Sequence, residues 1–235
     1  MIPISDDNPS RQTPFVTWAI IAACTAVYIW EVRQGVHMDA VFGSYGFVPK
    51  ALMSPPLSPA QETGWSALIN IFTSMFIHGG FLHLAGNMLY LWIFGNNIEE
   101  AMGHMRYLLF YLLCGVAAAL TMAFMDPVST VPMVGASGAI SGVLGAYMLL
   151  YPRARVTVIV PIVIIFYPFR IAAVWVVGIW FVMQLLSAAV VTPDSPGVAW
   201  WAHIGGFAAG LALTPFLKSS VVPFFGPRSL RGPWG

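Results

Sequence analysis

The chain has 235 residues, of which 58% are hydrophobic and only 8% are charged, and its formal net charge is +1. A soluble domain carries about a quarter charged residues, so this composition excludes an ordinary soluble protein and indicates an integral membrane protein. A net charge near zero without a basic cluster argues against nucleic-acid binding. Cys24 and Cys114 each lie within an apolar run, and we expect neither a disulfide nor a metal site there.

The first 14 residues are polar and lack the basic start of a cleavable signal peptide, so we interpret 1–14 as a short cytoplasmic lead. The apolar run from Phe15 to Val32 is long enough to span a bilayer. Residues 33–80 form a long, proline-rich connection. Its apolar stretch from Trp65 to Ile77 is too short to span, and we interpret it as interfacial or re-entrant.

Five further apolar runs, bounded by charged residues or prolines, predict additional membrane spans. They are Phe81 to Ile98, Tyr107 to Met125, Ser137 to Tyr151, Arg170 to Val191 and Ala202 to Leu217. The apolar stretch from Val156 to Phe169 is broken by Pro161 and Pro168, so we interpret it as interfacial. Residues 219–235 predict a flexible cytoplasmic tail. The expected fold class is therefore all-α, a polytopic membrane protein whose six transmembrane helices form a core over residues 15–218.

The basic residues orient the predicted spans. With the N-terminus inside, all lysines and arginines except Arg33 and Lys50 lie on the cytoplasmic side. This distribution satisfies the positive-inside rule and places both termini in the cytoplasm. The 33–80 connection then becomes an insertion on the external side.

Polar side chains are rare in the predicted spans, and four of them lie at one end. His83 and Asn87 occupy the first two turns of the second span, Ser137 opens the fourth, and His203 lies in the first turn of the sixth. These spans all begin on the external side, so the topology brings the four groups to a similar depth. Ionisable side chains inside a membrane are costly and are therefore candidates for function.

The fourth predicted span is short. From Ser137 to Tyr151 it measures about 22 Å at 1.5 Å per residue, against a hydrocarbon core about 30 Å thick. If Arg153 and Arg155 hold its cytoplasmic end at the interface, Ser137 lies below the outer surface. Irregular backbone at that depth is tolerated where it lines a water-filled cavity. We therefore expect a recessed, wet pocket that opens to the outside.

Small residues indicate how Ser137 and His203 meet. The stretches Gly138-x-x-x-Gly142 and Gly206-x-x-x-Gly210 form faces that let two helices approach closely. If these faces pack together, His203 and Ser137 become neighbours, and a neutral imidazole can accept the proton of a serine nucleophile. No Asp or Glu lies in the fourth or sixth span, which favours a Ser-His dyad over a triad.

Hydrogen-bond donors are expected around the same point. The backbone N–H groups of Ser137 and Gly138 open a helix and can bind an oxyanion. His83 and Asn87 lie one helical turn apart and can supply further donors. His78, just before the second span, is expected to be a structural hydrogen-bonding residue.

At these residues the sequence resembles the rhomboid intramembrane serine proteases. The matching motifs are Gly135-Ala136-Ser137-Gly138, His83-Leu84-Ala85-Gly86-Asn87, Ala202-His203-Ile204-Gly205-Gly206 and Phe76-Ile77-His78-Gly79-Gly80-Phe81-Leu82-His83. The resemblance implies that Ser137 is the nucleophile and His203 the general base. It also implies that His83, Asn87 and the Ser137 N–H group form the oxyanion hole.

The resemblance further implies a serine endopeptidase that cleaves transmembrane segments of other membrane proteins near the external surface. It implies no metal and no organic cofactor. The 33–80 connection would be a membrane-embedded loop, and the fifth span a lateral gate for the substrate. The expected partners are membrane-protein substrates and the lipid bilayer. The expected location is a bacterial plasma (inner) membrane, with a multi-pass topology.

Ser141 departs from the family pattern. Many members carry an aromatic residue four positions after the nucleophile, stacked on the catalytic imidazole. Here another ring, such as Tyr147 or Phe207, could support the imidazole. Ser141 itself could bond His203, a water or the carbonyl of Ser137. Ser141 as the nucleophile is a weaker alternative, since it lies one turn away from the free N–H groups.

Three other functions compete with the protease. A catalytically silent rhomboid-like protein that binds or escorts membrane proteins is the main alternative, and the presence of both Ser137 and His203 counts against it. A transporter or channel is disfavoured because the sequence shows no internal repeat or obvious ion path. A metalloprotease is disfavoured because the sequence lacks His-Glu-x-x-His.

Overall fold

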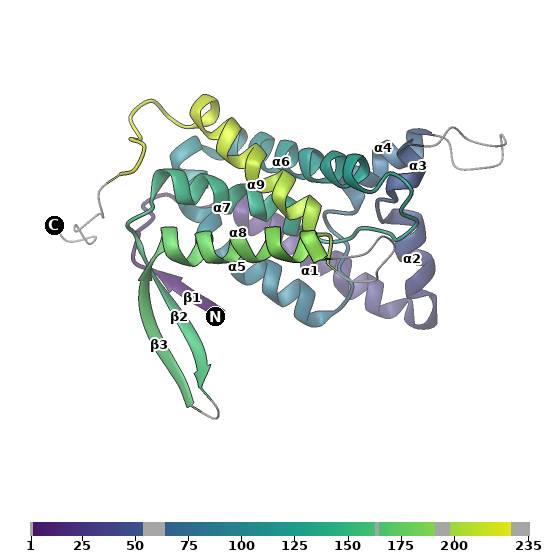
Figure 1. Cartoon of the computed structure of the whole chain (residues 1–235), viewed down its shortest axis with the longest axis horizontal. Helices are drawn as coiled ribbons and strands as arrows, with labels where there is room; N and C mark the ends of the chain where they lie inside the picture. The colour runs from purple at the N-terminus through teal and green to yellow at the C-terminus, as the bar shows by residue number, and fades with distance from the viewer. Residues whose placement is uncertain (1, 54–63, 163–164, 191–197, 227–235) are drawn as a thin grey trace.

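The computed structural model describes residues 2–53, 64–162, 165–190 and 198–226. Most of this chain is helical, and the long helices lie side by side as a bundle (Figure 1). The helices are α1 (Phe15–Arg33), α2 (Met38–Tyr45), α3 (Pro49–Met53), α4 (Gly64–Thr73), α5 (Phe81–Met102), α6 (His104–Met125), α7 (Ser137–Leu150), α8 (Ala173–Val190) and α9 (Trp200–Leu217), with a short 3₁₀ helix, η1 (Gly35–His37). The strands are β1 (Ile2–Asp6), β2 (Arg155–Ile162) and β3 (Ile165–Ala172).

Helix α7 lies at the centre of the bundle. Eleven of its 14 residues are buried, and it packs against α5, α6, α8 and α9. A helix that is apolar on every side belongs in a core, and the run of small and aliphatic residues in α7 has this character. Its 14 residues measure about 21 Å. The helix that begins with Ser137 is thus shorter than the thickness of a bilayer, as the sequence predicts.

The predicted close approach of two small-residue faces is confirmed between α7 and α9. A Cβ atom added to Gly206 would lie 1.9 Å from the carbonyl oxygen of Gly138, and one added to Gly210 would lie 2.1 Å from that of Gly142. Any side chain at these positions would force the two helices apart. The glycines at these positions therefore allow the short distance between the segments that carry Ser137 and His203.

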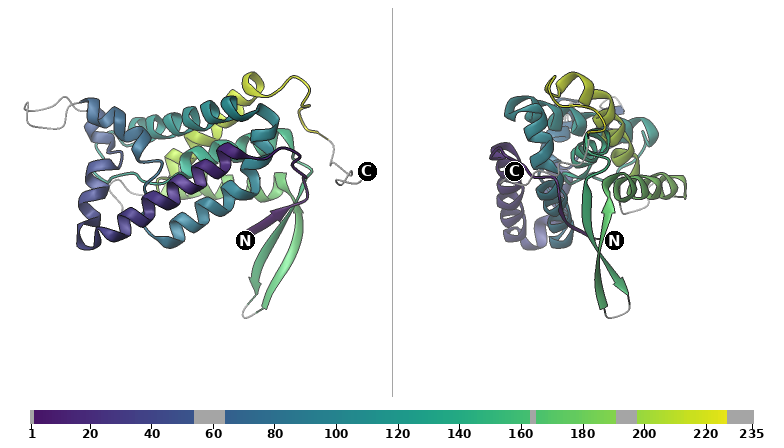
Figure 2. Two further views of the ribbon diagram at one scale, coloured as in Figure 1. Left: turned by 180° about the vertical axis from the view of Figure 1, so that it is seen from behind. Right: turned by 90° about the vertical axis from the view of Figure 1, so that its left-hand side faces the viewer.

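Within the described residues, three helices are long and apolar enough to cross a membrane, namely α1, α6 and α8. The other predicted spans correspond to α5, α7 and α9, so six spans stay a prediction. Strand β1 and residues 218–226 lie at one end of the bundle, whereas α2, α3 and α4 lie at the other (Figures 1 and 2). The cytoplasmic location of the first end is also still a prediction.

The second span was predicted to end at Ile98, before Glu99, but α5 continues to Met102. The reason is that the Glu99 carboxylate accepts hydrogen bonds from the first turn of α1. The Val16 N–H donates to it at 2.9 Å, and the Thr17 N–H and hydroxyl donate at 2.8 and 2.7 Å. A carboxylate at a helix N-terminus is well compensated, so this charge does not end the helix.

Other boundaries also differ by a few residues. Helix α6 begins at His104 rather than Tyr107, and α8 begins at Ala173, because Arg170 belongs to strand β3. The predicted end of the fifth span at Val191 lies outside the described residues.

A small sheet corrects the all-α prediction and the interfacial interpretation of 156–169. Strands β1, β2 and β3 form an antiparallel sheet in that order, and the β2–β3 hairpin extends beyond the bundle (Figure 2). Pro161 and Pro168 suggested broken structure. However, Pro168 lies on an edge strand, and Pro161 lies beyond Ile159, the last β2 residue that pairs with β1. Neither proline therefore removes a needed hydrogen bond from the centre of the sheet.

Parts of the two segments that flank the predicted core are also ordered. Residues 2–6 of the expected lead form strand β1, and Val156 and Val158 of β2 are fully buried against the bundle. In the segment predicted as a flexible tail, the Ser219 N–H donates to the carbonyl of Ala101 at 2.8 Å. The Phe225 N–H donates to the carbonyl of Leu149 at 3.0 Å. Residues 227–235 of that tail lie outside the described residues.

The connection between α1 and α5 holds the loop that precedes α7. Phe47 and Met133 exchange two backbone hydrogen bonds, at 2.9 and 2.7 Å. The Gly135 N–H donates to the carbonyl of Ser74 at 2.8 Å. The interpretation of 65–77 as a non-spanning piece agrees with α4, a ten-residue helix. The described parts of the long connection, residues 34–53 and 64–80, are therefore structured, and they fix the backbone just before Ser137.

Candidate active site

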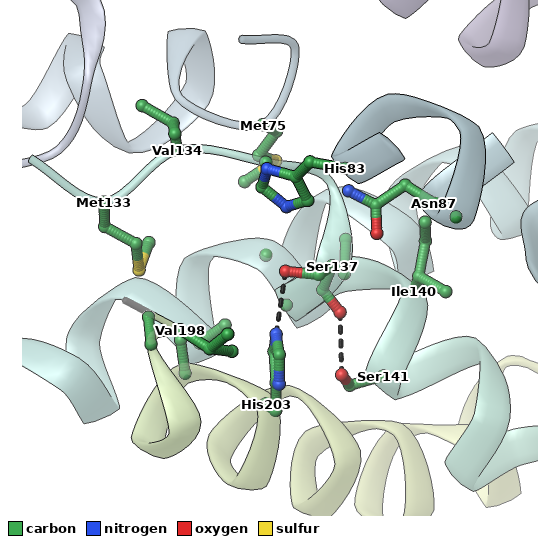
Figure 3. A pocket seen from close by; sticks show the side chains of 18 of the residues that line it. Met75, His83, Asn87, Met133, Val134, Ser137, Ile140, Ser141, Val198 and His203 are labelled. Atoms are coloured by element: carbon green, nitrogen blue, oxygen red, sulfur yellow. Dashed lines mark hydrogen bonds between the residues drawn. The ribbon is translucent and has the colours of Figure 1, made fainter. Parts of the chain in front are cut away.

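Ser137 and His203 lie within hydrogen-bond distance. The His203 Nε2 atom is 2.8 Å from the Ser137 Oγ atom (Figure 3). Ser137 is the first residue of α7, and His203 lies in the first turn of α9. Ser137 is half-buried and His203 is buried. The glycine contacts between these helices bring together two groups that are 66 residues apart in the chain.

The pair lies in a pocket of about 520 Å³. The pocket is bounded by α5, α6, α7, α8 and α9 and by the loop before α7. Its polar lining residues include His83, Asn87, Ser137, Ser141 and His203. This volume is within the usual range of ligand-binding clefts.

His83 and Asn87 lie on the α5 side of the pocket (Figure 3). The Asn87 Nδ2 atom is buried and has no hydrogen-bond partner among the described residues. A buried donor without a partner is costly, so this amide is suited to a ligand that brings an acceptor. The structure therefore brings the four polar residues predicted from the sequence to one pocket.

Gly135 is required beside His83. Its φ is +115°, which side-chain-bearing residues rarely adopt, and an added Cβ atom would lie 2.7 Å from the His83 ring. Two residues later α7 begins, and its first turn contains the N–H groups of Ser137 and Gly138. Such N–H groups have no acceptor within their own helix. The first turn of α7 thus offers both a hydroxyl and backbone donors to the pocket.

Ser141 bonds the backbone of the preceding turn. Its hydroxyl donates to the carbonyl of Ser137 at 2.7 Å, and the residue is fully buried. This contact confirms the interpretation of Ser141 as a residue that bonds the Ser137 carbonyl. The Ser141 hydroxyl is thus engaged within α7, one turn away from the free N–H groups.

The aromatic support of the imidazole comes from residues that the sequence analysis did not select. The centroids of the Trp180 and His203 rings are 5.9 Å apart, with 35° between the ring planes. The centroid of the Trp200 ring is 6.2 Å from that of His203, with 90° between the planes. Phe207 stacks on Phe181 instead. Trp180 belongs to α8, so a ring on a different helix faces the imidazole where the family often uses a residue of the nucleophile's own helix.

Gln184 is the second residue that the sequence analysis missed. Its Oε1 atom lies 2.8 Å from the His203 Nδ1 atom, and its Nε2 atom donates to the carbonyl of Trp180 at 3.1 Å. A polar side chain within an apolar span was a usable signal, because such groups are rare in membranes. Its partner could not be foreseen, since the pairing depends on how α8 crosses α9.

His78 has the structural role expected for it. Its backbone N–H donates to the buried Glu31 carboxylate at 3.1 Å. Its Nδ1 atom lies 3.1 Å from the carbonyl oxygen of Phe76. Cys24 and Cys114 are both buried and unbridged. Among the described residues, no cluster of three or more His, Cys, Asp or Glu side chains could hold a metal ion.

Comparison with known proteins decides the family. A model of the rhomboid domain matches residues 65–220. The chain belongs to the rhomboid family. It is 32% identical to RHOMBOID-like protein 5 of Arabidopsis thaliana over 88% of this chain and 69% of that protein.

Two other relatives match over shorter stretches. The chain is 34% identical to Rhomboid protein 1, mitochondrial, of Saccharomyces cerevisiae over 43% of this chain and 30% of that protein. It is 32% identical to Rhomboid protease GluP of Bacillus subtilis over 57% of this chain and 24% of that protein. The aligned stretch thus spans less than a third of these two relatives.

Membership of the rhomboid family, together with the apolar helices, identifies an integral membrane protein. The family includes serine proteases, and one relative carries protease in its name. Other relatives are named only rhomboid-like, and they include plant and mitochondrial proteins. The comparisons therefore do not point to a bacterial plasma membrane, which stays a prediction from the sequence.

Proposed function

We propose that this rhomboid protein is an intramembrane serine endopeptidase that cleaves transmembrane segments of other membrane proteins. Ser137 is the nucleophile and His203 the general base. The observation that carries the proposal is the 2.8 Å contact between His203 Nε2 and Ser137 Oγ inside a pocket at the start of a short central helix. A serine hydroxyl becomes a useful nucleophile when a base lies within this distance.

In the proposed reaction, His203 accepts the hydroxyl proton while Ser137 Oγ attacks the scissile carbonyl. The resulting oxyanion accepts hydrogen bonds from the N–H groups of Ser137 and Gly138 and from His83 and Asn87. The partnerless Nδ2 atom of Asn87 supports this role, because an oxyanion would supply its missing acceptor. His203 then protonates the leaving amine, and water hydrolyses the acyl-enzyme with His203 again acting as base.

The proposal includes the topology predicted from the sequence. Six spans with both termini in the cytoplasm place the pocket toward the external surface. Helix α7 is about 21 Å long, which would recess Ser137 below that surface and let water reach it through the pocket. A substrate must present an unwound peptide bond, since helical backbone groups are already hydrogen-bonded. We therefore expect substrates with helix-weakening residues near the cleaved bond.

The first experiment is a cleavage assay with purified protein and a model single-span substrate. We expect cleavage by the wild type, none by Ser137→Ala, and a measurable rate for Ser141→Ala. A fluorophosphonate probe should label the wild type and Ser141→Ala, but not Ser137→Ala. Full activity of Ser137→Ala would overturn the assignment. Client binding without cleavage by the wild type would instead favour the silent escort protein.

A further inference from the structure

Gln184 uses both ends of its side-chain amide. The residue is 5% exposed and lies on α8, outside the set of residues that line the pocket. One end of the amide contacts the carbonyl of Trp180, in the preceding turn, and the other contacts the Nδ1 atom of His203. The far side of the same imidazole contacts Ser137. The three side chains thus form one continuous chain of hydrogen bonds from α8 through α9 to α7.

The Trp180 carbonyl fixes which way the amide points. A carbonyl can only accept a hydrogen bond, so the amide group that faces it must be the NH₂. The Oε1 atom therefore faces His203, and it too can only accept. It follows that His203 carries its proton on Nδ1, which leaves the Nε2 lone pair directed at the Ser137 hydroxyl. This is the tautomer that a general base for Ser137 requires.

We propose that Gln184 is a positioning residue that holds His203 in its reactive tautomer and orientation, so that the site works as a Ser-His-Gln relay. The inference rests on the proposed function. Gln184 replaces the carboxylate that orients the histidine in many serine proteases. A neutral amide suits this place, because burying a carboxylate in a membrane-spanning bundle is much more costly than burying an amide with both ends bonded.

Helix α8 supplies a second support for the same ring. Trp180 and Gln184 are one helical turn apart and lie on one face of α8. The Trp180 ring lies 5.9 Å from the His203 ring at 35°, and the Trp180 carbonyl fixes the Gln184 amide. One turn of α8 therefore sets both the position and the tautomer of the base.

A purely structural Gln184 would make the same contacts but would affect only folding, so the test separates these roles. Gln184→Met keeps the length of the side chain and removes the acceptor. We expect its kcat to fall about 10- to 100-fold with KM unchanged, because the base is no longer oriented. Gln184→Glu keeps an oxygen acceptor for Nδ1–H and should recover most of this loss. Rates are counted per site that a fluorophosphonate titrates, so unfolded protein does not contribute.

Gln34 offers a matched control. It lies at the end of α1, and its Nε2 atom donates to the carbonyl of Trp30 at 3.2 Å, which is the same contact one turn back, with no histidine involved. Gln34→Met should retain the wild-type kcat. Wild-type kcat per titrated site in Gln184→Met would overturn the inference, as would an equal loss in Gln184→Met and Gln34→Met.

The tautomer can be observed without any activity. In ¹⁵N-histidine NMR spectra, His203, assigned by its loss in His203→Asn, should carry its proton on Nδ1 in the wild type. In Gln184→Met the population should shift toward the Nε2-protonated form. An unchanged tautomer would overturn the inference even if the wild type proved catalytically silent. A different result would separate the two proposals. If the wild type and Gln184→Met are fully active and Ser137→Ala is inactive, the proposed function stands and only the role of Gln184 is refuted.

Discussion

The Tyr147 hydroxyl donates a hydrogen bond to the carboxylate of Asp6, 141 residues earlier in the chain. This contact joins strand β1 to α7, the helix that begins with Ser137. Burial raises the pKa of Asp6 from its ordinary value of 3.8 to about 6, although the bond from Tyr147 works in the opposite direction. The N-terminal strand is therefore linked to the central helix through a group that titrates in the mildly acidic range.

The raised pKa of Asp6 predicts a pH-dependent stability. Between pH 3.8 and about 6 the folded protein holds a proton that the unfolded chain has released, so this contribution to stability is full below 3.8 and is lost as the pH rises to about 6. The loss is at most about 3 kcal/mol. Thermal unfolding in detergent should show that Asp6→Asn removes this part of the pH dependence. Asp39→Asn, at an exposed position, should retain it. Identical profiles for the wild type and Asp6→Asn would contradict the prediction.

Gly206 should not tolerate a side chain. In Gly206→Ala the new methyl group would overlap the carbonyl of Gly138, so α9 must move away from α7 and carry His203 with it. We expect a loss of about 1–3 kcal/mol in stability and a fall in cleavage larger than the unfolded fraction explains. Gly178→Ala on α8, where nothing lies within 4 Å of the added atom, is the matched control. Equal behaviour of the two variants would show that the packing of α7 against α9 does not depend on Gly206.

Gly135→Ala should damage the site with little effect on the rest of the fold. Both the positive φ and the closeness of the His83 ring oppose a Cβ atom there. The ring should be displaced, and kcat should fall about tenfold or more, as expected when a positioned donor moves by about an ångström. Gly43→Ala adds the same methyl group where nothing lies within 4 Å. Steady-state kinetics of the two variants, with melting temperatures, provide the comparison, and an unchanged kcat in Gly135→Ala would refute this role for Gly135.

Asn87→Ala tests the oxyanion hole. If the Asn87 amide binds the oxyanion, its removal should lower kcat about 10²- to 10³-fold and change KM little, because the bond forms only as charge develops on the carbonyl oxygen. The protein should not lose stability through a broken internal bond, since Asn87 Nδ2 has no partner among the described residues. A large fall in melting temperature with normal kcat per titrated site would instead identify Asn87 as a structural residue.

Much of this site could be predicted because its features are local. Ser137 opens α7 where a proline-containing loop meets an apolar run, and the small-residue faces predicted the packing that places His203 beside it. Short spacing along one helix or one strand is readable from the sequence. The role of Ser141 was also readable, because its partner lies one turn back.

The remaining features depend on how distant segments cross. Gln184 bonds His203 only because α8 lies against α9, and no spacing along α8 indicates that contact. The sheet was missed because Pro161 and Pro168 are tolerated only at the positions that the strand order gives them. Glu99 was expected to end a helix, but its carboxylate also accepts hydrogen bonds from Val16 and Thr17 at the start of α1, more than 80 residues earlier. In each case a contact with a residue far away in the chain decided the structure, and the local sequence does not show that contact.

The placement of Trp180 and Gln184 on one turn of α8 has a further consequence for the proposed reaction. Any displacement of α8 at this turn would remove both supports from the imidazole at once, so a chain with α8 drawn aside would hold a serine without an aligned base. The position of α8 would then determine whether the base is aligned for hydrolysis.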